Sequence, residues 1–302
     1  MPELPNIELY LEALRERIVG HPLDRMRTLT PFVLRSVRPA ISDIEGRIVT
    51  CFRRIGKRIV FEFEGGYFLV IHLMIAGRLS WQEEPFTIAR PGGKDGLAVL
   101  GFPTGFLLLT EAGSKKRASI YVVEGEADLA RHDPGGIDPL TCTLTEFTEM
   151  LTTTRRTLKR ALTDPRSFSG IGNAYSDEIL HTAKISPIRH TTTLDADELA
   201  RLHLACRDCL IAWTDKLRAE RKGKFPKRSD VTAFRPDFAV HGKYGKPCPV
   251  CGKPVQRIQY ADNETNYCAR CQNGDRILAD RSLSRLLKDD WPRDIDEIEV
   301  RP

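Results

Sequence analysis

The sequence predicts an α+β protein in three parts, and three observations carry that prediction. Apolar residues recur at helical spacing over 7–18, and short runs with strand-like alternation follow them. Helical patterns then take over from Thr145 to about Glu220. Two C-x2-C pairs lie near the C-terminus. We therefore expect a β-rich first part with a helix at its edge, a helical second part, and a metal-binding third part.

Within the first part, the helix is expected to run to Ile18, with Asn6 as its N-cap and Gly20 as its stop. Two hairpins should follow, one with Gly65-Gly66 at its turn. Their strands are expected at residues 58–64, 67–73, 97–100 and 106–110. The Pro- and Gly-rich segment 132–139 is expected to link the first two parts.

Length and composition exclude several classes of protein. The 302 residues correspond to about two domains of ordinary size. Hydrophobic residues make up 41% and charged residues 29%, as in globular proteins, so wholesale disorder is excluded. The longest apolar stretch, 68–77, is shorter than the roughly 18 residues of a membrane span, and the N-terminus lacks a secretory pattern. We therefore expect the protein in the reducing cytoplasm.

Positive charge is concentrated in one region. Between Lys216 and Arg257 the net charge is +9, although the whole chain carries only +5. Phe225, Phe234 and Tyr244 interleave with these basic residues, and no amphipathic helical period is evident. This pattern favours nucleic acid over a membrane as partner, while a solvated basic loop is the alternative.

The cysteine cluster is the most specific local signal. Cys248, Cys251, Cys268 and Cys271 form the pattern C-x2-C-x16-C-x2-C. Each pair places two thiolates on one tight turn, so two turns complete a tetrahedral zinc shell without an open position. A single structural zinc ion is therefore predicted, and a disulfide role is disfavoured in a reducing compartment. Cys206 and Cys209 share a helical face with Leu202, which favours a core role for these two thiols.

A glycine-rich turn precedes a predicted helix at Gly170-Ile171-Gly172-Asn173. Glycines let the backbone approach a partner closely, and the free N–H groups at a helix start attract anions such as phosphate. A plain helix-capping turn explains Gly170 and Gly172 equally well.

Together these motifs resemble the formamidopyrimidine-DNA glycosylase and endonuclease VIII family. The resemblance covers residues 2 to about 272, and the tail 273–302 extends beyond it. It rests on five features in order: Pro2-Glu3-Leu4-Pro5 with Glu8, Gly56-Lys57 before a strand, His72-Leu73 followed by Gly77, the turn ending in Asn173, and the four-cysteine ribbon.

The resemblance implies a division into four segments: an N-terminal catalytic β-sandwich, a helix-two-turns-helix domain, a zinc finger and a C-terminal extension, at 1–135, 136–235, 236–272 and 273–302. It also implies a bifunctional DNA glycosylase and abasic-site lyase. The partner would be double-stranded DNA with a damaged base or abasic site, bound by a monomer.

The catalytic residues implied are Pro2, Glu3 and Lys57. Pro2 would be the nucleophile once Met1 is removed, and an α-amine has a reference pKa of about 7.7 to 8.0, so part of it is neutral near pH 7. A secondary amine that attacks C1′ of deoxyribose gives a cationic iminium, which permits elimination of the 3′ phosphate. Glu3 resembles the general acid, and Lys57 resembles the lysine that holds a phosphate. An ordinary terminus and a surface lysine are the alternatives.

DNA contacts are implied for a further set of residues: His72, Ile75, Lys159, Gly170, Gly172, Asn173 and Asn263. Three positions depart from the family pattern. Asn6 stands where the family usually has Glu, Asn263 replaces the finger arginine that grips phosphate, and Ile75 replaces the methionine wedge. Segment 113–118 has no clear match to the Arg-x-Phe void-filling partners, and Lys224–Phe238 has an unusual, basic composition for the base-capping loop.

Two alternatives from other classes stay open on the sequence alone. A DNA-damage-binding protein of the same fold with weakened catalysis would account for Asn6 and Asn263. A zinc-ribbon regulator that reads DNA sequence would leave Pro2, Glu3 and Lys57 without a purpose. The sequence does not name the lesion or the opposite base.

Overall fold

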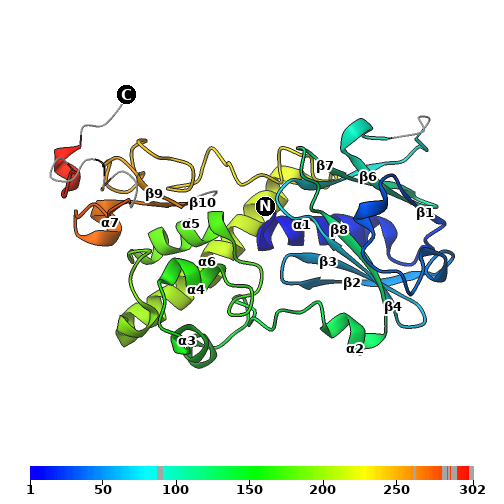
Figure 1. The fold of residues 1–302 in the computed structure, drawn as a ribbon, viewed down its shortest axis with the longest axis horizontal. Coiled ribbons are helices and arrows are strands. Elements are labelled where there is room, and N and C mark those ends of the chain that lie inside the picture. The colour runs from blue at the N-terminus through cyan, green and yellow to red at the C-terminus, as the bar shows by residue number, and fades with distance from the viewer. Residues whose placement is uncertain (87–90, 261–262, 281–283, 285, 287–290, 299–302) are drawn as a thin grey trace. The chain divides into compact units, whose positions relative to one another are not determined.

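The computed structural model describes residues 1–86, 91–260, 263–280, 284, 286 and 291–298. The chain divides into two compact units. Unit 1 comprises Met1–Pro134 and Trp213–Thr232, and unit 2 comprises Gly135–Ala212 and Ala233–Pro302. The long helix α6 (Ala196–Arg221) contributes to both (Figure 1).

Unit 1 contains two four-stranded antiparallel sheets. The strands of the first sheet are, in order, β1 (Arg25–Thr28), β6 (Gly96–Phe102), β7 (Gly105–Glu111) and β5 (Gly77–Gln82). Those of the second are β2 (Val49–Ile55), β3 (Arg58–Phe63), β4 (Tyr67–His72) and β8 (Ser119–Glu124). Both predicted hairpins are confirmed, as β3–β4 and β6–β7. Gly65 and Gly66 turn the first one with φ of 83° and 76°.

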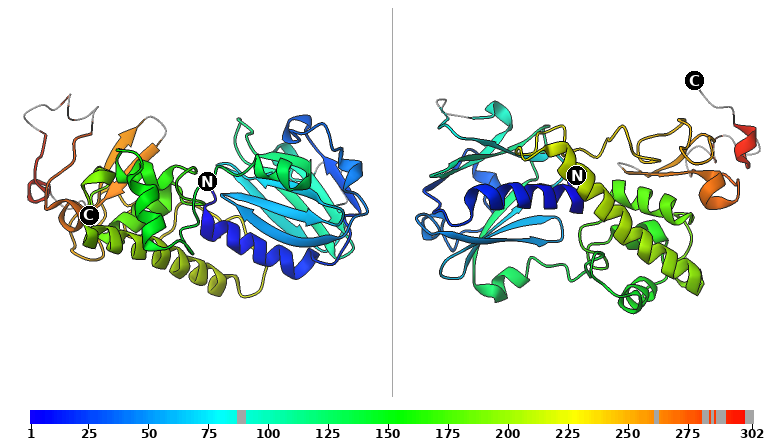
Figure 2. Two further views of the ribbon diagram at one scale, coloured as in Figure 1. Left: turned by 90° about the horizontal axis from the view of Figure 1, so that it is seen from below. Right: turned by 180° about the vertical axis from the view of Figure 1, so that it is seen from behind.

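The two sheets share one apolar core, which confirms the β-sandwich. Phe61 and Ile71 of one sheet and Leu100 and Leu107 of the other belong to the same buried cluster. Helix α1 (Leu4–Ile18) adds its apolar face to this cluster and lies alongside β2 and β3 (Figure 2). A short helix, α2 (Gly125–Ala130), follows β8.

The start of α1 differs from the prediction. Its N-cap is Glu3, not Asn6, so that prediction is wrong. Leu4 and Pro5 occupy the first turn, where proline is tolerated because no intrahelical N–H bond is required there. The Asn6 side-chain oxygen instead accepts a hydrogen bond from the Glu3 N–H at 3.1 Å. Asn6 therefore holds the helix start from inside the first turn.

Unit 2 is helical, as predicted, and it also contains a small hairpin that was not predicted. Its helices are α3 (Leu144–Thr152), α4 (Leu158–Thr163), α5 (Asn173–Ala183), the first part of α6, and α7 (Ala269–Asn273). Strands β9 (Gln256–Tyr260) and β10 (Asn263–Tyr267) pair antiparallel. Cys206 and Cys209 are buried in α6, which confirms their core role. From the tail, Leu278 and Ile295 pack on Tyr267 in one buried cluster.

The basic segment begins on α6, and its first part, up to Thr232, belongs to unit 1 and packs within that unit. Arg218 pairs with Glu12 and Arg221 with Glu16, both on α1. Beyond the helix, the Phe225 ring stacks on the Trp81 ring, and Val231 is fully buried. The apolar side chains of this part are therefore packed, while the basic side chains of Lys224, Lys227 and Arg228 are exposed. None of the described helices is long and apolar enough to cross a membrane.

Candidate functional site

In unit 1 the predicted nucleophile lies at the start of α1, with Pro2 and Glu3 both buried. The pKa of the Met1 terminal amine is lowered, chiefly because burial removes the charged form from water. Arg78 and Lys57 lower it further, while the Glu3 carboxylate opposes the shift. Lys57 and Arg78 therefore lie close enough to the chain start for their charges to act on it.

Lys57 sits in the turn between β2 and β3, and α1 holds that turn. Arg54 Nε donates to Glu8 Oε1 at 2.7 Å, and Arg54 Nη1 donates to the Gly56 carbonyl at 3.3 Å. The Arg54 side chain is only 8% exposed, so this pair is well shielded from water. Glu8, whose role the sequence left open, thus ties the Lys57 turn to α1, whose N-cap is Glu3.

His72 ends β4, directly opposite Arg58 of β3. Burial lowers its pKa to about 4, and the positive charges of Arg58 and Lys57 contribute. At neutral pH the imidazole is therefore uncharged, and one ring nitrogen carries a proton that it can donate.

The lowered pKa of His72 predicts a pH-dependent stability. Below about pH 6.5 the unfolded chain binds a proton at His72 that the folded chain accepts only near pH 4. Stability should therefore fall as pH falls through this window, and His72→Gln should reduce that loss. Urea unfolding of both proteins at pH 7.5, 6 and 5 checks the expectation. An identical fall with pH in both would contradict it.

Ile75 lies at the tip of a rigid turn after β4 and is 58% exposed. The Gly77 N–H donates to the Leu73 carbonyl at 2.8 Å, and Met74 has a φ of 51°. A Cβ at Gly77 would lie 2.2 Å from the Leu73 oxygen, so only glycine closes this turn. The turn thus presents an apolar side chain to solvent from a fixed backbone.

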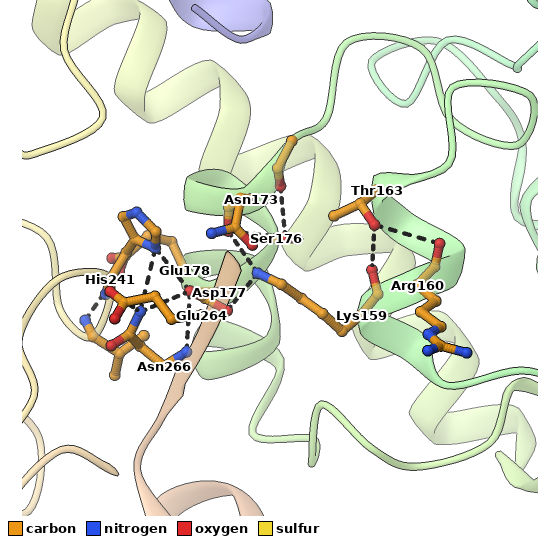
Figure 3. A network of polar contacts seen from close by, with 12 residues as sticks. Lys159, Arg160, Thr163, Asn173, Ser176, Asp177, Glu178, His241, Glu264 and Asn266 are labelled. Atoms are coloured by element: carbon orange, nitrogen blue, oxygen red, sulfur yellow. Dashed lines mark hydrogen bonds and ion pairs between the residues drawn. The ribbon is translucent and has the colours of Figure 1, made fainter. Parts of the chain in front are cut away.

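In unit 2 Lys159 of α4 holds the start of α5 (Figure 3). Its ammonium donates to the Asn173 carbonyl and to Asp177 Oδ1, both at 2.6 Å. Lys159 is only 9% exposed and Asp177 is fully buried. Gly170, with a φ of 85°, and Gly172, the N-cap of α5, form the turn that leads into this helix.

The same network reaches the hairpin of the cysteine module. Asp177 Oδ2 lies 2.8 Å from His241 Nδ1 and accepts the Asn266 backbone N–H at 3.2 Å (Figure 3). Glu178 accepts the N–H groups of Ala239, Val240 and His241 at 2.8 to 2.9 Å. Burial raises the Glu178 pKa, and these bonds oppose that shift.

Sequence reasoning missed Asp177, Glu178, His241 and Asn266. One signal pointed to the first two: adjacent carboxylates stand between the apolar pairs Ala174-Tyr175 and Ile179-Leu180 of one helix, and buried charges require partners. Asn263, which was predicted, is the first residue of β10, opposite Tyr260. Its side chain lies outside the described part of the structure.

The four predicted zinc ligands come together. Their sulfur atoms all lie within 4.8 Å of one another, with Cys248 and Cys271 at 3.9 Å and Cys251 and Cys268 at 3.3 Å. A tetrahedral ion with Zn–S bonds of about 2.3 Å separates its sulfurs by about 3.8 Å. The donor set and spacing fit one structural zinc ion. His181 Nε2 of α5 lies 3.3 Å from Cys248 Sγ, next to this shell.

Models of known families match three segments of the chain. The N-terminal domain of formamidopyrimidine-DNA glycosylase matches residues 1–99, and the H2TH domain of the same enzyme matches residues 136–214. The zinc finger found in that enzyme and in IleRS matches residues 245–274. The three matches define a class of protein with a glycosylase-type first domain, a helical domain and a zinc finger.

Individual relatives place the protein within this class. Formamidopyrimidine-DNA glycosylase of Thermus thermophilus is 30% identical over 278 residues, covering 90% of this chain and 98% of its own. A formamidopyrimidine-DNA glycosylase-like protein of Mycobacterium tuberculosis is 40% identical over 160 residues, covering 51% of this chain and 94% of its own. The chain belongs to the formamidopyrimidine-DNA glycosylase family.

Solved structures agree with this assignment. The crystal structure of MutM (Fpg) from Thermus thermophilus has a TM-score of 0.72 and 29% identity, covering 90% of this chain and 98% of that one. The Lactococcus lactis Fpg in complex with DNA containing N7-benzyl-Fapy-dG has a TM-score of 0.77 and 25% identity, covering 90% and 100%.

Proposed function

We propose that the protein is a DNA glycosylase that excises a damaged base from duplex DNA and then cleaves the strand at the abasic site. The observation that carries the proposal is the chain start, where Pro2 is buried and where burial and the charges of Arg78 and Lys57 lower the pKa of the preceding Met1 amine. The same surroundings would favour the neutral, nucleophilic form of the Pro2 amine once Met1 is removed. Relatives named formamidopyrimidine-DNA glycosylase, one of them solved with lesion-containing DNA, support the proposal.

The reaction begins when the Pro2 nitrogen, freed by removal of Met1, attacks C1′ of the damaged nucleotide. The new C–N bond forms as the glycosidic bond breaks, and the base leaves with that electron pair and takes up the proton that the Pro2 nitrogen loses. Glu3 protonates the ring oxygen, so the sugar opens to an iminium. Loss of a C2′ proton then expels the 3′ phosphate, and water hydrolyses the iminium to release the amine.

The remaining predicted residues bind DNA in this proposal. Lys57 and neutral His72 donate hydrogen bonds to phosphates beside the damaged nucleotide. Ile75 fills the gap left by the extruded base, for which an exposed apolar side chain on a rigid turn is suited.

In unit 2 the N–H groups of the Gly170–Asn173 turn and the Asn173 side chain bind phosphate at the start of α5. Lys159 acts as a positioning residue, because its ammonium is already bonded to Asp177 and Asn173. Asn263 offers a neutral contact at the finger hairpin.

Three further predictions concern the whole protein. We propose four domains, at residues 1–135, 136–235, 236–272 and 273–302, a monomeric state, and a cytoplasmic location. A reducing compartment suits four cysteines that must remain thiolates to bind zinc.

Cleavage of defined duplexes tests the proposed function. The duplexes carry 8-oxo-G, Fapy-dG, an oxidised pyrimidine or an abasic site, and an undamaged duplex is the control. We expect base release from at least one lesion and strand cleavage at the abasic site. Tight binding to damaged DNA without turnover would favour the damage-binding alternative, and sequence-dependent binding to undamaged DNA would favour the regulator.

A further inference from the structure

The carboxamide of Asn6 has a fixed orientation at the start of α1. Asn6 is 3% exposed, and its Oδ1 accepts the hydrogen bond from the Glu3 N–H. A backbone N–H can bond only to an acceptor, so the oxygen must face Glu3 and the amide nitrogen must point elsewhere. The nitrogen belongs to the same small planar group, so it also lies near the Pro2–Glu3 peptide.

The amide nitrogen of Asn6 is a buried donor without a partner. Among the residues that the structure describes, no acceptor lies within hydrogen-bond distance of Asn6 Nδ2. Buried donors are rarely left unpaired, because each one costs stability. Here the unpaired donor belongs to the carboxamide that bonds the Glu3 N–H, and Glu3 directly follows the residue whose amine the proposed reaction uses. A substrate atom that enters this site is therefore a natural acceptor.

We propose that Asn6 is a specificity-determining residue whose Nδ2 donates a hydrogen bond to a carbonyl oxygen of the damaged base. This inference rests on the proposed function. The base is attached to C1′, the carbon that Pro2 attacks, so its atoms nearest the glycosidic nitrogen come closest to the start of α1. In 8-oxoguanine and in pyrimidines, a carbonyl carbon is bonded directly to that nitrogen. The proposed acceptor is the oxygen of this carbonyl.

Such a donor would aid the reaction as well as select the base. When the glycosidic bond breaks, its electron pair passes to the base, and part of the negative charge resides on this carbonyl oxygen. A fixed N–H at that oxygen stabilises the departing base. A carboxylate at position 6, as in the usual family pattern, would accept hydrogen bonds from the base instead of donating them. Asn6 therefore suits bases with an acceptor at this position.

The isosteric change Asn6→Asp tests the donor end of the carboxamide apart from its acceptor end. A carboxylate still accepts the Glu3 N–H, so the helix start is kept, but the donor becomes an acceptor that repels a carbonyl oxygen. The measurement is single-turnover base release from a duplex with 8-oxo-G or an oxidised pyrimidine, whichever the unaltered protein excises faster. Cleavage at an abasic site, where no base is present, is measured in parallel. Both reactions use the Pro2 amine, so the ratio of the base-release rate to the abasic-site cleavage rate is insensitive to a change in that amine.

We expect Asn6→Asp to lower this ratio about tenfold or more. Asn6→Ala, which adds no charge, should also lower it, and thermal unfolding should show both variants folded. An unchanged ratio, or an equal loss of both reactions, would overturn the inference, since Asn6 would then act on the helix start or on the amine alone. If the unaltered protein neither excises a base nor cleaves an abasic site, the proposed function fails instead.

Discussion

Protein that begins at Pro2 is expected to be trapped covalently by borohydride on DNA with an abasic site, and protein with a blocked terminal amine is expected to lose at least about a thousandfold in trapping. Only an uncharged amine with a free electron pair can form the iminium that borohydride reduces. Retaining Met1 should have the same effect, because the Pro2 nitrogen is then part of a peptide bond. The trapped fraction is read as a protein–DNA band in a denaturing gel.

A matched control separates chemistry from binding. The blocked protein should bind abasic DNA almost as tightly as the free protein, because the residues proposed to contact phosphate lie elsewhere in both units. Mass spectrometry of the trapped species should place the crosslink on residue 2. Equal trapping by the blocked protein, or a crosslink on a lysine such as Lys57, would refute proline as the nucleophile.

Local patterns predicted much of the fold because their physical causes are local. The spacing of Ile7, Leu11, Leu14 and Ile18 results from the helical repeat, and all four side chains are fully buried. The glycines of the β3–β4 turn adopt the positive φ that such a turn requires. The Asn6 cap was misplaced because Pro5 in the first turn allows the helix to start earlier than its polar residue suggests.

The candidate site was less predictable because its contacts join distant segments. Asp177 meets His241 and Asn266 across 64 and 89 residues of sequence. Arg54 joins Glu8 across 46 residues. No periodicity specifies such pairs, so the sequence indicated Lys57 and Asn173 through the family resemblance but not the groups that hold them. Burial of the charges, visible only in the fold, identifies those groups.

Loss of the zinc ion is expected to unfold the finger while unit 1 stays folded. Structural zinc contributes about 10 to 16 kcal/mol in isolated fingers, more than a module of this size gains from its small apolar core. Cys268→Ser should therefore abolish zinc binding, measured as metal per chain. The amides of Val240, His241 and Asn266 should then exchange hydrogen rapidly. In the folded finger these N–H groups donate to the carboxylates of Glu178 and Asp177, and an unfolded finger no longer holds them there.

The matched control for zinc is Cys142→Ser, the same atomic change at a half-buried thiol that is not one of the four predicted zinc ligands. It should retain one zinc per chain and slow amide exchange in the finger. In Cys268→Ser, strand amides of β3 and β4 should remain protected, because their core is formed within unit 1. Zinc-free protein with fully protected finger amides and unchanged DNA affinity would show that the four cysteines do not need the metal. Collapse of protection in β3 and β4 would show instead that unit 1 depends on the finger for its stability.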